Sequence, residues 1–115
     1  MTKTAIDLAT FKGLQDTAGA EFVAELVQAF FEEAPTMLAD MRSALAARDA
    51  ERFRRAAHSL KSNSNTFGAL ELGAKAKALE LGGIAYALET QPEPLAAVET
   101  EYALVAARLK ELSSG

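Results

Sequence analysis

The stretch FVAELVQAFFEEAPTMLADMRSAL, residues 22–45, decides the fold. Its apolar side chains recur at steps of four and seven residues, the spacing of one face of an amphipathic α-helix. We expect this apolar row to face a core; its members are Phe22, Leu26, Phe30, Met37, Met41 and Leu45. Because the step from Phe30 to Met37 keeps the register across Pro35, the pattern predicts one kinked helix and not two separate helices.

Shorter segments with the same spacing lie on both sides of the long helix. They predict a short helix over residues 7–16, a third helix after the N-cap Asp49, a fourth over residues 69–81 that stops at Gly82-Gly83, and a last one from about Pro94 to Leu112. Residues 84–93 fit either a brief extension of the fourth helix or a folded connection. We therefore expect an all-α protein, an antiparallel four-helix bundle with a short additional N-terminal helix.

Composition supports this fold and excludes several functions. The chain has 115 residues, enough for one domain over residues 1–115, and its 25 Ala and 15 Leu far outnumber its 4 Val and 2 Ile. It has no cysteine, hence no disulfide or thiolate chemistry. A net charge of -4 argues against nucleic acid as a partner. Without an apolar signal core or a membrane-length apolar run, we expect a cytoplasmic protein, and a monomer, since the bundle can bury its own apolar rows.

The chemistry concentrates around the single histidine, His58. In the third helix the predicted inward row is Phe53, Ala57, Leu60 and Ser64. His58 is one residue, about 100°, away from Ala57, so its ring is expected to face outward. The residues on its own face are all polar, namely Arg54, Arg55, Lys61, Ser62 and Asn65. No Asp or Glu occurs between Arg52 and Leu70, so an acidic protein places a basic patch around its only imidazole.

An exposed imidazole among cations suits phosphoryl transfer. Nearby positive charges disfavour the imidazolium form, which keeps the ring neutral and nucleophilic, and the same charges attract a phosphoryl group. Small side chains follow along the helix, including Ser62 and Asn65, and leave room for a partner to approach. We expect the ring to face water without a carboxylate partner. A ring sealed inside the protein or paired with a carboxylate would end the case for this interpretation.

The run AHSLKSNSNTFGA, residues 57–69, resembles the signature of the histidine-containing phosphotransfer (HPt) domains of bacterial phosphorelays. That signature is a His-x-Leu-Lys-Gly motif followed by a Gly-Ala turn, and the resemblance extends to the length and helical plan of the whole chain. It implies that His58 is the phosphoacceptor, that Lys61 interacts with the phosphoryl group and that Gly68 belongs to the turn between the two motif helices. Ser62 stands where the family commonly has glycine.

The resemblance also implies a relay and not a kinase. The implied partners are response-regulator receiver domains, whose aspartates donate and accept the phosphoryl group and which supply the Mg²⁺ site, with a hybrid histidine kinase as a second candidate. Arg54, Arg55, Ser62 and Asn65 are candidates for docking a receiver, although both arginines also fit an ordinary solvated helix face. The chain itself shows no nucleotide-binding loop, cofactor motif or metal-ligand cluster. A non-phosphorylated helical adaptor that docks a receiver or kinase remains the alternative.

Overall fold

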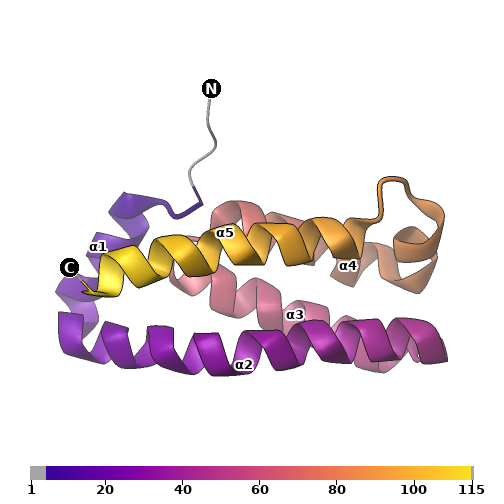
Figure 1. Ribbon diagram of the computed structural model, residues 1–115, viewed down its shortest axis with the longest axis horizontal. Helices are drawn as coiled ribbons and strands as arrows, with labels where there is room; N and C mark the ends of the chain where they lie inside the picture. Colours follow the sequence, from indigo (N-terminus) through magenta and orange to yellow (C-terminus); the bar gives the residue numbers. More distant parts are fainter. Residues whose placement is uncertain (1–4, 115) are drawn as a thin grey trace.

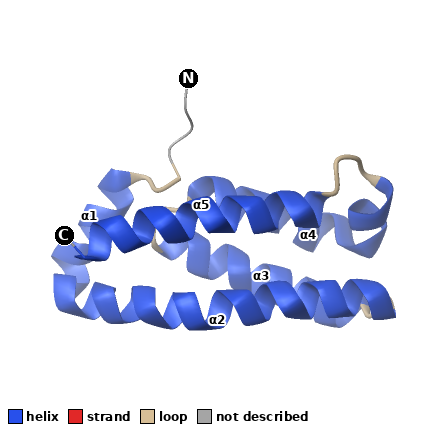
Figure 2. Ribbon diagram, viewed as in Figure 1, coloured by secondary structure: helices blue, strands red, loops and turns tan. Residues whose placement is uncertain are grey.

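The computed structural model describes residues 5–114, which form five helices and no strand. The helices are α1 (Leu8–Ala18), α2 (Ala20–Ala47), α3 (Ala50–Thr66), α4 (Leu70–Glu89) and α5 (Pro94–Ser114). Figure 1 shows α2 to α5 lying alongside one another with successive helices antiparallel, while α1 lies across the end of the bundle at which α2 begins. Only short loops join them (Figure 2). The predicted four-helix bundle with an additional N-terminal helix is confirmed.

Side-chain caps explain where two of these helices begin. The carboxylate of Asp7 accepts a hydrogen bond of 3.1 Å from the backbone N–H of Thr10 at the start of α1. Asp49 does the same for α3 through the N–H of Arg52, at 3.2 Å, which confirms its predicted role as N-cap. The last helix begins at Pro94, where the first turn tolerates a residue without an N–H. None of the described helices combines the length and apolar content needed to cross a membrane.

The core lies between the four long helices. All four residues of the inward row predicted for α3 are buried, and so is Phe67 at the end of that helix. The ring of Phe67 packs 5.4 Å, centroid to centroid, from that of Phe30 on α2. The buried residues of α4 and α5 that complete this layer are Leu72, Ala76, Leu79, Leu95, Val98, Val105 and Leu109. Since α3 buries one narrow row, its opposite face stays free for a site.

α2 is one helix that continues through Pro35, as predicted, but its inward row differs at the start. Phe22 is 51% exposed, so its assignment to the core was wrong, and Val23 is buried instead. At 100° per residue, Phe22 is eight residues from Phe30 and therefore rotated about 80° from the core direction. Val23 is seven residues from Phe30 and rotated only about 20°. Because an α-helix has 3.6 residues per turn, a row of residues read in repeated steps of four drifts around the helix and leaves the core face.

The regular first part of α4 ends at Gly82-Gly83, as the sequence suggested. Gly83 has φ 69° and ψ -163°, a non-helical conformation that makes a sharp bend, and a second helical segment follows it to Glu89. The bend requires glycine at position 82, because a Cβ atom on any other residue there would lie only 2.5 Å from the Cβ of Tyr86. Of the ambiguous segment 84–93, the first six residues therefore extend the fourth helix, and only the remainder forms a connection.

The turn between α3 and α4 is fixed by Gly68. This residue has φ 85°, which favours glycine, and its carbonyl accepts a hydrogen bond of 2.7 Å from the backbone N–H of Asp7. A Cβ atom on Gly68 would lie 2.8 Å from the Asp7 carbonyl oxygen. The turn thus anchors the segment that leads into α1.

We expect Gly68→Ala to lower the free energy of unfolding by about 2 kcal/mol or more. The left-handed backbone conformation is unfavourable for alanine, and the added Cβ atom would also displace the Asp7 carbonyl. The measurement is thermal or urea unfolding followed by circular dichroism. Gly13→Ala is the matched control, since Gly13 lies inside α1 with nothing within 4 Å of an added Cβ. Equal stability of the two variants would show that the turn does not need glycine.

Candidate functional site

His58 projects from the outer face of α3, as its position next to the buried Ala57 predicted. Its side chain is 53% exposed. No side chain of residues 5–114 makes a hydrogen bond with Nε2, whereas Nδ1 has a partner. One ring nitrogen is therefore available at the surface.

The partner of Nδ1 is a carboxylate, so the expectation that the ring has none was wrong. Nδ1 of His58 lies 2.9 Å from Oε2 of Glu80, a residue of α4. The acid-free window between Arg52 and Leu70 describes only the chain around His58, and α4 packs antiparallel against α3 and brings Glu80 from 22 residues away. Because an ionised carboxylate can only accept, Nδ1 carries a proton, and in the neutral ring the free lone pair therefore lies on Nε2. The pairing selects the tautomer and leaves the exposed nitrogen nucleophilic.

Glu80 also joins His58 to Lys61. Its other oxygen, Oε1, lies 2.9 Å from Nζ of Lys61, and only 13% of its side chain is exposed. The hydrogen bond from Lys61, and then that from His58, hold the pKa of Glu80 below its ordinary value. The carboxylate is therefore ionised at neutral pH and bridges the two residues of the predicted motif.

The two arginines near His58 are partnered and do not surround the ring as free cations. Arg54 makes two hydrogen bonds with the carboxylate of Glu51, at 3.2 and 2.6 Å, and Nε of Arg55 lies 3.8 Å from the same group. These bonds lower the pKa of Glu51. The basic patch predicted from the sequence is thus largely compensated, although the Arg55 side chain stays mostly exposed.

The remaining predicted residues lie along α3 away from Glu80. Ser62 is exposed one turn beyond His58. The side chain of Asn65 lies against α4, in space left by the missing side chain of Gly73. Gly68 is ten residues from His58, about 15 Å along the helix direction, and belongs to the turn and not to the site. The structure therefore brings together His58, Lys61 and Glu80, with Ser62 exposed one turn away on α3.

The described residues around His58 form neither a hydrolytic catalytic triad nor a metal site. Ser59 and Ser62 are near His58 in sequence, yet within residues 5–114 no serine hydroxyl hydrogen-bonds the ring, which a hydrolytic triad would require. No group of three or more Asp, Glu or His side chains in this part of the chain could hold a metal ion.

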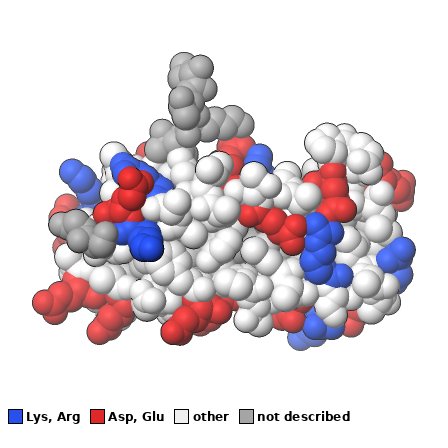
Figure 3. Space-filling model, viewed as in Figure 1, with Lys and Arg blue, Asp and Glu red and all other residues white. Residues whose placement is uncertain are grey.

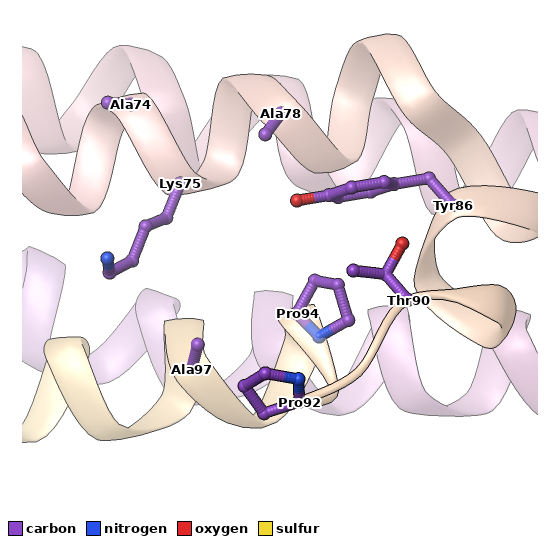
Figure 4. A pocket seen from close by; sticks show the side chains of 8 residues that line it. All are labelled: Ala74, Lys75, Ala78, Tyr86, Thr90, Pro92, Pro94 and Ala97. Carbon is purple, nitrogen blue, oxygen red and sulfur yellow. The ribbon is translucent and has the colours of Figure 1, made fainter.

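A hollow of about 370 Å³ lies elsewhere, between α4, the loop after it and α5 (Figure 4). Alanines 74, 78 and 97 leave the space open, and the Tyr86 ring extends across it opposite Pro92 and Pro94. Its lining includes none of His58, Lys61 and Glu80. Figure 3 shows the side of the bundle on which α2 and α5 lie in front of α3 and α4, where acidic side chains line the edge formed by the first half of α2. Neither feature belongs to the histidine site.

We expect Lys61→Met to raise the pKa of Glu80 toward its ordinary value, because Lys61 is the largest cause of the depression. A depressed carboxyl pKa means that the contribution of the ionised group to stability is present at neutral pH and lost as the pH falls through the folded-state pKa. The measurement is an NMR titration of the Glu80 carboxyl carbon in both proteins. An unchanged midpoint in the variant would show that the Lys61–Glu80 pair does not form in solution.

Together, fold and site define a class of protein: a small helical bundle that presents one histidine on its outer face beside a lysine. The family model described as the Hpt domain matches residues 25–114. The chain belongs to the Hpt domain family. Members of this family are phosphotransfer intermediates and not kinases, and they interact with response-regulator receiver domains. Membership therefore supports a role in phosphotransfer relay.

A solved structure agrees with this assignment. The crystal structure of histidine-containing phosphotransfer protein B (HptB) from Pseudomonas aeruginosa PAO1 matches with a TM-score of 0.84 and 29% sequence identity. The match covers 98% of this chain and 97% of that one. No curated protein sequence matches the chain.

Sequence reasoning missed one residue of the site, Glu80. The only signal available was the bundle itself: if α3 and α4 are antiparallel about the turn at Gly68, residues equally distant from that turn lie side by side. His58 is ten residues before Gly68 and Glu80 twelve after it, which places them at similar heights. A search for acidic residues at that height would have found Glu80.

Proposed function

We propose that this chain is a phosphorelay intermediate that accepts a phosphoryl group on Nε2 of His58 from the aspartate of one receiver domain and passes it to the aspartate of another. The observation that carries this proposal is the state of the ring. Nδ1 is held by Glu80 at 2.9 Å, while no side chain of residues 5–114 bonds Nε2 of a ring that is 53% exposed. A nucleophile prepared in this way needs no further group from its own chain to attack an activated phosphoryl donor.

Transfer exchanges a P–O bond of the receiver for a P–N bond of His58. The lone pair of Nε2 attacks the phosphorus of the aspartyl phosphate, a P–N bond forms, and the bond from phosphorus to the carboxyl oxygen breaks. The receiver's aspartate leaves as a carboxylate, and the proton on Nδ1 stays in place. The ring then carries a positive charge that faces the Glu80 carboxylate, while Nζ of Lys61 can offset the negative charge of the phosphoryl group. Delivery to the second receiver is the same step in reverse.

Pairing with a carboxylate thus supports transfer and does not block it. A bond from Glu80 to Nε2 would have occupied the nucleophile, whereas the bond to Nδ1 orients the ring and stabilises the charge that develops on it. Lys61 assists electrostatically and forms no covalent bond. Its loss should therefore weaken transfer less than the loss of His58.

The alternative is a helical adaptor that docks the same partners without being phosphorylated. The two functions separate when the protein is incubated with a receiver domain carrying labelled aspartyl phosphate. The relay predicts label on this chain that is stable to alkali and labile to acid, as phosphohistidine is. An adaptor predicts a complex with the receiver and no transfer, and this outcome with every receiver of the host would contradict the relay.

Several further properties are proposed on the same basis. We take residues 1–115 as one domain acting as a monomer in the cytoplasm, with receiver domains and a hybrid histidine kinase as partners. The Mg²⁺ required for transfer is proposed to bind to the receiver. Arg55 and Ser62 are proposed to contact the docked receiver because both are exposed on the His58 face.

A further inference from the structure

Lys77 on α4 is a cation without a partner. Within residues 5–114, Lys12 and Lys77 are the two cationic side chains that make neither a hydrogen bond nor an ion pair. The arginines near His58 differ from them, since both are paired with the carboxylate of Glu51. The one acidic residue of α4 within a helical turn of Lys77 is Glu80, and both of its oxygens already have partners. The charge of Lys77 is therefore uncompensated.

The antiparallel register of α3 and α4 places Lys77 beside the histidine site. The bond between His58 and Glu80 shows that these two positions lie side by side. Three residues nearer the turn at Gly68, the corresponding positions are Lys61 on α3 and Lys77 on α4. Both are about 4.5 Å further along the helix axes than the histidine–glutamate pair. The two lysines thus lie at the same height on neighbouring helices.

Lys77 and the His58 ring lie on the same side of the contact between α3 and α4. At 100° per residue, Lys77 is rotated about 60° from Glu80, which reaches toward α3, and about 160° from the buried Leu79. On α3, His58 is likewise rotated about 60° from Lys61, which reaches toward α4 to bind Glu80. Both rotations point away from the core, and both side chains are exposed.

The charge of a phosphorylated site gives Lys77 a role. A phosphoryl group carries up to about two negative charges at neutral pH. On phosphorylated His58, Glu80 offsets the positive charge of the ring, and Lys61 offsets one negative charge of the phosphoryl group. One negative charge then remains, and Lys77 is the neighbouring cation that can offset it. The unphosphorylated site has no such excess, because Lys61 and Glu80 neutralise each other.

We propose that Lys77 is a second phosphoryl-binding residue, which contacts the phosphoryl group on His58 from α4 while Lys61 contacts it from α3. This inference rests on the proposed function and extends it, because the family signature assigns this role to Lys61 alone. Lys61 is shared with Glu80, whereas Lys77 can bind the phosphoryl group without leaving another partner.

The first test compares uptake of phosphate by Lys77→Met, Lys12→Met and the unaltered protein. The donor is phosphoramidate, which transfers its phosphoryl group to Nε2 and leaves as ammonia, so no receiver is needed. We expect Lys77→Met to be phosphorylated about threefold more slowly at low salt, the effect of one exposed ion pair, and the difference to shrink at high salt. Lys12→Met is the matched control, an equally unpartnered lysine on α1, and should behave as the unaltered protein. Lys77→Arg keeps the charge and should retain the rate.

NMR of the lysine side chains tests the contact itself. A cation that gains an anionic partner holds its proton more strongly, so phosphorylation of His58 should raise the pKa of Lys77. We expect its titration midpoint to move upward by about 0.5 in pH, and that of Lys12 to stay in place. The chain can be phosphorylated by phosphoramidate or by a receiver for this comparison. Unaltered melting temperatures are the control for the fold, since Lys77 is exposed.

The outcomes separate this inference from the relay. If Lys77→Met is phosphorylated as fast as Lys12→Met, or if phosphorylation of His58 leaves the Lys77 midpoint unchanged, Lys77 does not bind the phosphoryl group, while the relay is unaffected. If both effects occur with phosphoramidate and no receiver of the host transfers phosphate, the relay is wrong while the role of Lys77 stands. If His58 takes phosphate from neither kind of donor, both are wrong.

Discussion

His58→Gln is expected to accept no detectable phosphoryl group from a phosphorylated receiver domain, a loss of at least about a thousandfold in the rate of uptake. The glutamine amide has no lone pair on nitrogen that can attack phosphorus, although its N–H groups can still donate to Glu80. The measurement is the appearance of acid-labile label on the protein after mixing with the labelled receiver.

The fold should not change, because more than half of the His58 side chain faces water. Exposed substitutions of this kind alter stability by roughly 0.5 kcal/mol or less. Unaltered helicity and melting temperature are therefore the control. Label that persisted in His58→Gln would place the acceptor on another residue.

Glu80→Ala is expected to slow phosphoryl uptake about tenfold to a hundredfold, by analogy with the loss found when the hydrogen-bond partners that orient metal-binding histidines are removed. Without the carboxylate, nothing fixes the proton on Nδ1, and nothing balances the positive charge that develops on the ring during attack. Lys61 also loses the group that holds it beside the ring. Single-turnover transfer from the labelled receiver measures this rate.

Two comparisons show whether Glu80 acts through His58. Glu80→Gln should recover part of the rate, because the amide oxygen still accepts from Nδ1. Glu51→Ala should leave the rate nearly unchanged, since Glu51 pairs with Arg54 and Arg55 and does not contact the ring. The pH profile of transfer should move in the Glu80 variants and not in Glu51→Ala. If Glu80→Ala transferred at the normal rate, the tautomer would not depend on this carboxylate.

The fold was predictable from the sequence because helices of a bundle bury apolar residues at regular intervals. The inward row of α3, the N-cap Asp49 and the start of the last helix at Pro94 all follow from local rules, and all are found in the structure. The predicted row of α2 was wrong at Phe22, because a row read in steps of four residues drifts away from the core face. The two adjacent glycines do interrupt α4, at Gly83, and the sequence left open that a second helical segment follows to Glu89.

The site was predictable to the extent that it lies on one helix. His58, Lys61 and Ser62 share the outer face of α3, and helical spacing alone brings them together. Glu80 belongs to another helix, so its approach depends on how α3 and α4 pack and on the length of the turn at Gly68. The prediction of a basic site without a carboxylate was wrong for the same reason. A stretch of sequence without Asp or Glu does not exclude an acidic residue that another helix brings close in space.

The most direct test of the central claim is the identity of the phosphorylated atom. The protein, labelled with ¹⁵N in its single histidine, is mixed with a phosphorylated receiver domain, and the ring nitrogens are followed by NMR. The phosphoryl group is predicted on Nε2, with Nδ1 still protonated and coupled to its hydrogen. Phosphate on Nδ1, or a ring that stays unmodified while the receiver loses its phosphate to this chain, would contradict it.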